Sequence, residues 1–218
     1  MARPKILQAD RNYTFGSYFE MPYGTDEILA EFGYHFSISR LSLPRTTRAL
    51  DRLPYLQQQI EDIFPLVRLS NETARRETLV SPVLLEVIRY SQCQLRIEYP
   101  VTVSNWLTGN LDYLLKSDRE LLIIKAKNDD LTRGFTQLSV ELIALSLCEE
   151  RDILYGAVTM GDTWRFGKLD RPNQSIVQDI TLYNIPDNLE ELTRILVGIL
   201  ELPLEAKSET VPKENDDS

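Results

Sequence analysis

The order of hydrophobic and polar positions predicts a chain in which helices and strands are mixed. Alternating apolar and polar residues predict a strand over residues 34–43, and apolar residues near helical spacing predict a helix over 48–63. A polar residue followed by early acids predicts that another helix starts at Thr25. These segments lie in an α/β N-terminal extension, residues 1–68, which we expect to pack on the core.

The pattern after this extension predicts a core over residues 69–204. Its first helix spans 71–90 and is expected to kink at Pro82, because proline lacks a backbone donor. Strands are predicted over 95–103, 107–116, 120–126, 153–160, 164–169 and 178–183, and helices over 131–148 and 189–200. This order predicts an α/β fold with a mixed central β-sheet flanked by helices. Residues 205–218 have the charged composition of an acidic disordered tail.

Two lysines interrupt the apolar run of the strand predicted over 120–126, one within the strand and one directly after it. Side chains alternate along a strand, so Lys125 and Lys127 are expected to project from the same face. Asp112 precedes Lys125 by thirteen positions, on the preceding strand. If the two strands pair as a hairpin, one carboxylate and two ammonium groups meet beside the sheet. Ionisable groups seldom lie next to a core without a reason, which indicates a functional site.

The motif Gly109-Asn-Leu-Asp112, the apolar strand ending in Lys127 and the following helix with Gln137 resemble the PD-(D/E)XK superfamily. This group comprises restriction-endonuclease-like phosphodiesterases. The order of elements extends the resemblance over roughly residues 70–170. The resemblance implies a restriction-endonuclease-like sheet and hydrolysis of DNA phosphodiester bonds with Mg²⁺, for which Mn²⁺ would substitute.

The resemblance also implies a role for each matching residue. Asp112 would bind the metal, Lys127 would position and activate the attacking water, and Gln137 would complete the site. Glu77, in the first core helix, would be a supporting metal ligand. The second acid of the family corresponds to Lys125, and here the sequence departs from the family pattern.

Three explanations of Lys125 remain open. In the first, Glu141 supplies the missing acid from the same helix face as Gln137, so that Asp112 and Glu141 bind Mg²⁺. In the second, Asp112 and Lys125 form an ion pair where a metal once bound, and the fold is a catalytically inactive module for nucleic-acid or protein binding. In the third, the motif arises by chance. A simpler role for Glu141 is to pair with Lys125 and so tie the helix to the sheet.

Charge changes the expectation about partners. The 218 residues contain 24 basic and 33 acidic side chains, a net charge of −9. Phosphate binding depends on local basic surface, so DNA remains the expected partner, bound weakly. The candidate phosphate contacts are Arg40, Arg45, Arg48, Arg52, Arg75 and Arg76. For each arginine the alternative is a solvated basic surface, and a homodimer is a further option.

Few residues are available for other kinds of chemistry. Cys93 and Cys148 are expected to be reduced thiols in a cytoplasmic protein, and the single histidine, His35, argues against histidine-based zinc sites. No apolar run approaches the ~20 residues that cross a bilayer, so no membrane partner is expected. An aromatic-rich segment within residues 13–23 is expected to pack on the core, or else to form a partner interface.

Overall fold

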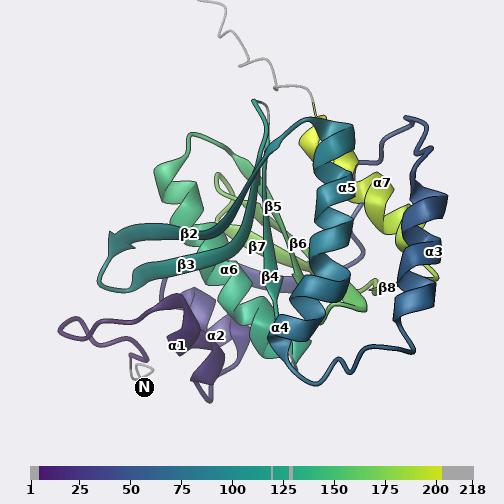
Figure 1. The fold of residues 1–218 in the computed structure, drawn as a ribbon. Helices are drawn as coiled ribbons and strands as arrows, with labels where there is room; N and C mark the ends of the chain where they lie inside the picture. Colours follow the sequence, from purple (N-terminus) through teal and green to yellow (C-terminus); the bar gives the residue numbers. More distant parts are fainter. Residues whose placement is uncertain (1–4, 119, 128–129, 203–218) are drawn as a thin grey trace, which may run out of the picture.

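A computed structural model describes residues 5–118, 120–127 and 130–202, in which helices cover both faces of a mixed β-sheet (Figure 1). The strands are β1 (His35–Ser39), β2 (Gln94–Ser104), β3 (Leu107–Lys116), β4 (Leu121–Ala126), β5 (Ile153–Thr159), β6 (Thr163–Asp170), β7 (Ser175–Asp179) and β8 (Tyr183–Asn184). The helices are α1 (Phe15–Glu20), α2 (Thr25–Ala30), α3 (Leu53–Ile63), α4 (Glu72–Arg75), the π-helical turn η1 (Arg76–Val80), α5 (Ser81–Ser91), α6 (Leu131–Cys148) and α7 (Leu189–Leu200). The predicted mixed α/β fold is confirmed.

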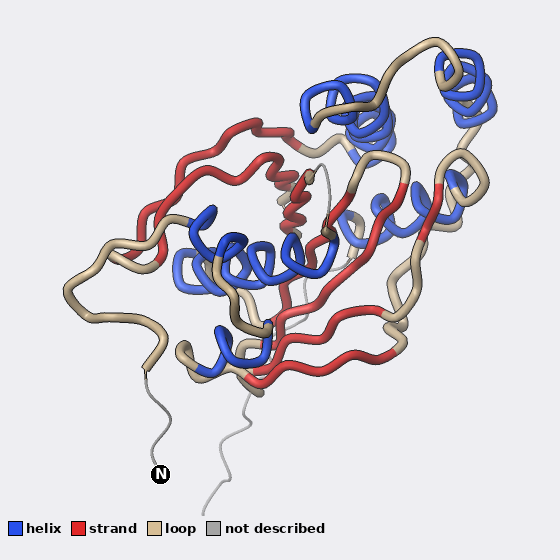
Figure 2. Tube along the Cα trace, turned by 90° about the horizontal axis from the view of Figure 1, so that it is seen from below, coloured by secondary structure: helices blue, strands red, loops and turns tan. Residues whose placement is uncertain are grey.

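The strands form one eight-stranded sheet in the order β1-β7-β6-β5-β4-β3-β2, with β8 pairing with β6. The pairs β1–β7 and β4–β5 are parallel, and the others are antiparallel. α6 makes the crossover between the parallel strands β4 and β5. Figure 2 shows the sheet from below, with its strands fanned by twist. The arrangement is consistent with the restriction-endonuclease-like fold expected from the motifs.

The two faces of the sheet bury separate apolar clusters. On one face, α3, α5 and α7 pack on Leu122 and Ile124 of β4. On the other, α1, α2 and α6 pack on Ile123. Alternation along β4 therefore sends successive side chains to opposite clusters. Buried residues lie on all sides of α6, as its nearly uniform apolar composition predicts.

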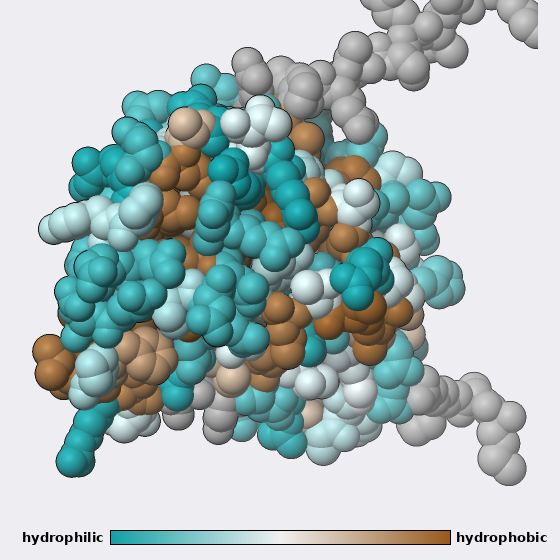
Figure 3. Space-filling model, turned by 90° about the vertical axis from the view of Figure 1, so that its right-hand side faces the viewer, coloured by the Kyte–Doolittle hydropathy of each residue, from teal (hydrophilic) through white to brown (hydrophobic). Residues whose placement is uncertain are grey.

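The molecular surface over α3 and α7 is mostly polar, in contrast to the apolar clusters beneath it (Figure 3). Figure 3 shows mostly hydrophilic residues on this side of the molecule, with hydrophobic residues in separate patches. α3 buries Leu53, Leu56 and Ile60 and exposes the residues between them, which include three consecutive glutamines and Tyr55. No described helix has the length and apolar character needed to cross a membrane.

The helix predicted over 71–90 has a different geometry. It consists of α4, η1 and α5, and the departure from α-helical geometry precedes Pro82. In the π-helical turn the hydrogen bond spans five residues instead of four, from Ser81 N to Arg76 O. Pro82 falls in the first turn of α5. The proline then needs no backbone donor. The irregularity in this helix is a π-helical turn in the residues before Pro82.

Three other boundaries differ from prediction. The helix predicted over 48–63 begins only at Leu53, because Pro54 suits a first helical turn and disfavours helix before it. The strand predicted over 34–43 ends at Ser39, with the end of its pairing with β7. The strand predicted over 178–183 is divided between β7 and β8, because the Asp179 carboxylate accepts from Leu41 N and Thr181 N and turns the chain.

The extension over residues 1–68 supplies β1 to the same sheet, and α1 and α2 to the layer around α6. The helix predicted to start at Thr25 is α2, whereas α1 was not predicted. The predicted disordered tail, 205–218, lies outside the described residues.

Candidate active site

The β3–β4 hairpin brings together the two charged residues that the sequence pattern pairs. Tyr113 of β3 is opposite Ile124 of β4, so Asp112 faces Lys125. The Lys125 ammonium donates to Asp112 Oδ1 at 2.7 Å, and the backbone N–H of Ala126 donates to Asp112 Oδ2 at 2.8 Å. Both carboxylate oxygens of Asp112 therefore have a partner on β4.

α6 contributes a second carboxylate to this place. Glu141 Oε1 lies 3.4 Å from Lys125 Nζ and accepts a hydrogen bond of 2.9 Å from Gln137 Nε2. The spacing of four residues puts Gln137 and Glu141 on one helix face, as predicted. We call Asp112, Lys125, Gln137 and Glu141 the buried corner.

The buried corner is closed to solvent. The exposed fraction is 5% for Asp112, 4% for Lys125 and 0% for Glu141. Burial lowers the pKa of Lys125, but the charges of Glu141 and Asp112 outweigh burial and raise it above its ordinary value. Lys125 is therefore a cation. Burial raises the pKa of Glu141 to about 7, against the opposing effect of Lys125.

Lys127 follows β4 and places its ammonium over an aromatic ring of α1. Its Nζ is 4.3 Å from the centre of the Phe19 ring, which belongs to α1. Its stem passes over Gly134, where an added Cβ would lie 3.1 Å from Lys127 Cγ. Burial and the neighbouring Lys125 lower the pKa of Lys127. The contact with Phe19 was not predicted, although the aromatic-rich segment to which Phe19 belongs was expected to pack on the core.

Glu77 lies apart from the buried corner. It is exposed on η1, and the described residues include no cluster of three or more His, Cys, Asp or Glu side chains that could hold a metal ion. The neighbouring Arg76 donates to Glu98 at 2.8 Å and to the Tyr113 hydroxyl at 3.2 Å. The contact between Arg76 and Tyr113 links the first core helix to β3. It was not predicted, because the sequence pattern describes each segment separately.

The oxygen atoms of the buried corner suit a cation only in part. Glu141 Oε2 and Gln137 Oε1 are buried and accept no hydrogen bond from the described residues. Oxygens of this kind are the ligands that Mg²⁺ prefers. The Lys125 ammonium, however, already lies between the two carboxylates, and its charge opposes a divalent cation. As arranged, these residues do not fit Mg²⁺.

Three of the four predicted phosphate contacts in the N-terminal extension pair with acids, whereas Arg40 donates only to the Thr181 hydroxyl, at 3.4 Å, among the described contacts. Arg45 pairs with Glu191 at 2.6 Å, and Arg52 pairs with Glu86 at 3.1 Å. Arg48 pairs with Glu201 at 2.8 Å. The same is true of Arg75, which pairs with Asp162 at 3.3 Å.

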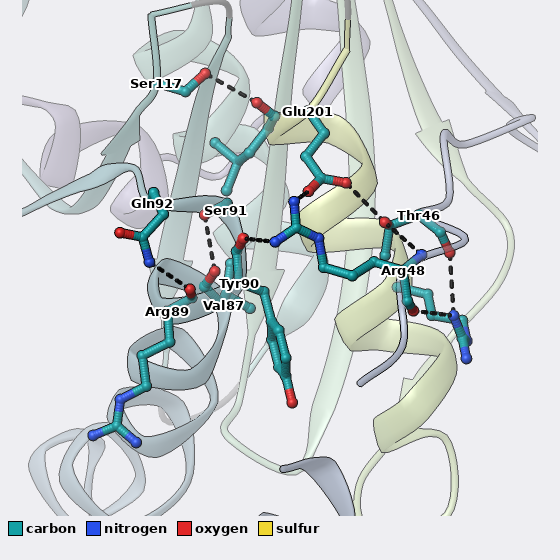
Figure 4. Close-up of polar contacts among 11 residues, drawn as sticks. Thr46, Arg48, Val87, Arg89, Tyr90, Ser91, Gln92, Ser117 and Glu201 are labelled. Atoms are coloured by element: carbon teal, nitrogen blue, oxygen red, sulfur yellow. Dashed lines mark hydrogen bonds and ion pairs between the residues drawn. The ribbon is translucent and has the colours of Figure 1, made fainter. Parts of the chain in front are cut away.

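Arg48 also borders a polar cleft of about 1050 Å³. The close-up in Figure 4 shows the Arg48 guanidinium between the Tyr90 carbonyl, to which it donates at 2.9 Å, and the Glu201 carboxylate. The charged residues that line the cleft are Arg48, Arg96, Lys116, Asp118, Glu149, Arg151 and Glu201. Cations and acids alternate here, and Lys116 pairs with Glu149 at 2.8 Å. The cleft is therefore no uniform basic surface for phosphate.

No family model matches this sequence, and no curated protein matches it. Among solved structures, the chain is similar to a chain of the DrdV–DNA complex determined by cryo-electron microscopy, with 15% sequence identity and a TM-score of 0.47. The match covers 72% of this chain and 14% of that chain. A likeness this remote says nothing of the chemistry at the buried corner.

Proposed function

We propose that the chain is a catalytically inactive module on a nuclease-like fold, in which the Lys125 ammonium takes the place of the metal ion. The observation that carries this proposal is the position of Lys125 Nζ, 2.7 Å from Asp112 Oδ1 and 3.4 Å from Glu141 Oε1, inside a corner closed to solvent. A buried cation that already lies against both carboxylates weakens their attraction for a divalent ion.

The ion arrangement also opposes metal entry. Mg²⁺ would have to displace the Lys125 ammonium, lose part of its hydration shell and reach carboxylates that are almost fully buried. The displaced ammonium would then need another partner in a low-dielectric environment. Each of these steps costs free energy, which bonds to the unpartnered oxygens Glu141 Oε2 and Gln137 Oε1 would have to offset.

The partner proposed for this module is DNA, on the strength of the motif order, and the proposal includes self-association into a homodimer. The paired arginines of the N-terminal extension argue for weak binding, because a phosphate has to compete with Glu191, Glu201 or Glu86 for them. Binding of this kind should weaken steeply with salt.

The test combines cleavage and metal binding on the full chain. Plasmid and single-stranded DNA are incubated with the protein and Mg²⁺ or Mn²⁺, and the melting temperature is measured with and without each metal. We expect no cleavage and no change in melting temperature, because a ligand that does not bind the native state cannot stabilise it. A metal-dependent rise in the melting temperature would contradict the proposal.

A second candidate is a metal-dependent DNA nuclease, and the unpartnered oxygens Glu141 Oε2 and Gln137 Oε1 favour it. Asp112 and Glu141 would bind Mg²⁺ or Mn²⁺, with Glu77 as a supporting acid, and Lys127 would position water. Lys125 would first have to leave the two carboxylates. The discriminating result is cleavage that is lost in Lys127→Ala; cleavage that survives this substitution would exclude the assigned site.

A further inference from the structure

The two outer strands of the sheet differ in how they are protected. At one edge, β2 contains Pro100, which has no N–H, and Glu98, whose φ of 51° interrupts the regular strand. Charged residues and prolines on an edge strand discourage pairing with another chain. At the other edge, β1 has no charged residue, no proline and no left-handed residue over 35–39.

The open side of β1 presents backbone groups at two positions. His35 N donates to Gln174 O at 2.8 Å, and Ile180 N donates to Ser39 O at 3.1 Å. Since alternate residues of a parallel pair bond to the same neighbour, positions 35, 37 and 39 are directed to β7. The N–H and C=O groups of Phe36 and Ile38 therefore point to the open side. Among the described residues, β7 is the only strand that pairs with β1.

Apolar surface accompanies this open edge. Ile38 is 57% exposed, and Ile180, which directly follows β7, is 48% exposed. The two side chains lie at the same end of neighbouring strands, because Ile180 N bonds to the residue after Ile38. In Figure 2, β1 is the outermost strand, at the lower side of the sheet.

We propose that β1 pairs antiparallel with β1 of a second copy of this chain, about a twofold axis through Ser37. In this register Phe36 lies opposite Ile38 of the second copy, and Ser37 lies opposite its own counterpart. Phe36 and Ile38 are the residues whose backbone groups face outward, so the two copies exchange four backbone hydrogen bonds. Apolar residues then face apolar residues, and serine faces serine.

The sequence of β1 is the reason for choosing a second copy over another polypeptide. The segment His35-Phe-Ser-Ile-Ser39 is self-complementary about its central serine, with polar residues at 35, 37 and 39 and apolar residues at 36 and 38. A twofold axis also brings the exposed Ile38 of one copy beside the edge of the other. An interface built on a five-residue edge strand is small, so we expect a dimer that dissociates on dilution.

This inference rests on the homodimer included in the proposed function and gives it an interface. The experiment is sedimentation equilibrium of the full chain, whose mass is 25.2 kDa, over a range of concentrations. The unmodified chain should show a monomer–dimer equilibrium. A single Ser37→Lys or Ser37→Glu substitution places two like charges about 4.5 Å apart at the Cα atoms across the axis, so each variant alone should be monomeric.

A mixture of the Ser37→Lys and Ser37→Glu variants should recover the dimer, because each lysine then faces a glutamate. Ser37 is exposed, so both variants should retain the circular dichroism spectrum of the unmodified chain. The matched control is Ile97→Lys on β2, where the isoleucine is 53% exposed and the dimer should persist.

Three results would overturn the β1 interface: a monomeric unmodified chain at all concentrations, a dimer that tolerates Ser37→Lys, or a mixture that stays monomeric. A chain that is monomeric but binds an extended peptide along β1 would likewise replace the second copy as occupant. A monomeric unmodified chain would also remove the homodimer from the proposed function, but none of these results affects the metal and cleavage assays at Lys125, which test the inactive site separately.

Discussion

Lys125 Nζ lies 2.7 Å from Asp112 Oδ1, in a corner where both side chains are almost fully buried. A buried ion pair of this kind constrains its surroundings more than it stabilises the fold, because desolvation offsets much of the attraction. Removing one partner, in contrast, leaves an unpaired charge in the protein interior. The predictions about Lys125 follow from this asymmetry.

Lys125→Met keeps the length of the side chain and removes its charge. Asp112 and Glu141 then face each other without a cation, so the free energy of unfolding should fall by about 3–5 kcal/mol at neutral pH. Urea unfolding measures this loss. The control is Lys116→Met, which removes a partly exposed partner of Glu149 and should change stability by less than ~1 kcal/mol. Equal losses in the two variants would contradict the importance of burial.

Lys125→Glu should create the metal affinity that the native chain lacks. The substitution removes the ammonium and adds a third carboxylate next to Asp112 and Glu141, oxygen ligands of the type that Mg²⁺ and Mn²⁺ prefer. The variant should therefore be unstable without metal and gain melting temperature with millimolar Mn²⁺. Differential scanning calorimetry with and without Mn²⁺ measures the gain. If Mn²⁺ leaves the melting temperature of the variant unchanged, features other than Lys125 also exclude the metal ion.

Gly134→Ala should destabilise the chain although alanine favours helix. An added Cβ would lie 2.8 Å from Val158 Cγ2 and 3.1 Å from Lys127 Cγ, so α6 would have to move away from β5. Overpacking of this kind costs about 1–3 kcal/mol, against about 1 kcal/mol gained in helix propensity. The control is Gly16→Ala in α1, where the nearest atom, Thr14 Oγ1, is 3.8 Å away and no loss is expected. Thermal unfolding of the two variants separates packing from propensity.

The sequence pattern predicted the parts of the fold that periodicity determines. The expected hairpin brings Asp112 to Lys125, and helical spacing places Gln137 and Glu141 on one face. Alternation and spacing specify direction within an element but not the distance between elements. The sequence did not show whether Glu141 and Asp112 enclose a metal ion or the Lys125 ammonium. That depends on how closely α6 packs on β4, which only the three-dimensional arrangement shows.

The same reasoning explains why the ion pairs of the N-terminal extension were not predicted. The extension contains a basic run, in which the acidic partners of Arg45, Arg48 and Arg52 lie far away in the sequence, on α5 and α7 or next to them. Pairs separated by 34 residues or more leave no local signal. The start of α3 was placed too early for a different reason, since the turn before Pro54 has the apolar spacing of a helix without its backbone geometry.

Glu141 should make the stability of the chain depend on pH. Burial raises its pKa from the ordinary value of 4.5 to about 7 in the folded state. Between these two values the folded chain binds more protons than the unfolded chain, so the contribution of Glu141 to the free energy of unfolding decreases as pH rises from 4.5 to 7 and is constant above. The total change is at most about 3–4 kcal/mol, since a pKa unit corresponds to about 1.4 kcal/mol.

Glu141→Gln isolates this contribution, because glutamine resembles the protonated acid and does not titrate. Urea unfolding of the native chain and of the variant should be compared at intervals between pH 4.5 and 8. The difference in free energy should favour the variant increasingly up to about pH 7 and then level off, while titration of all other groups cancels. A difference that stays constant over this range would mean that Glu141 is ionised throughout, held by Lys125 as a full ion pair.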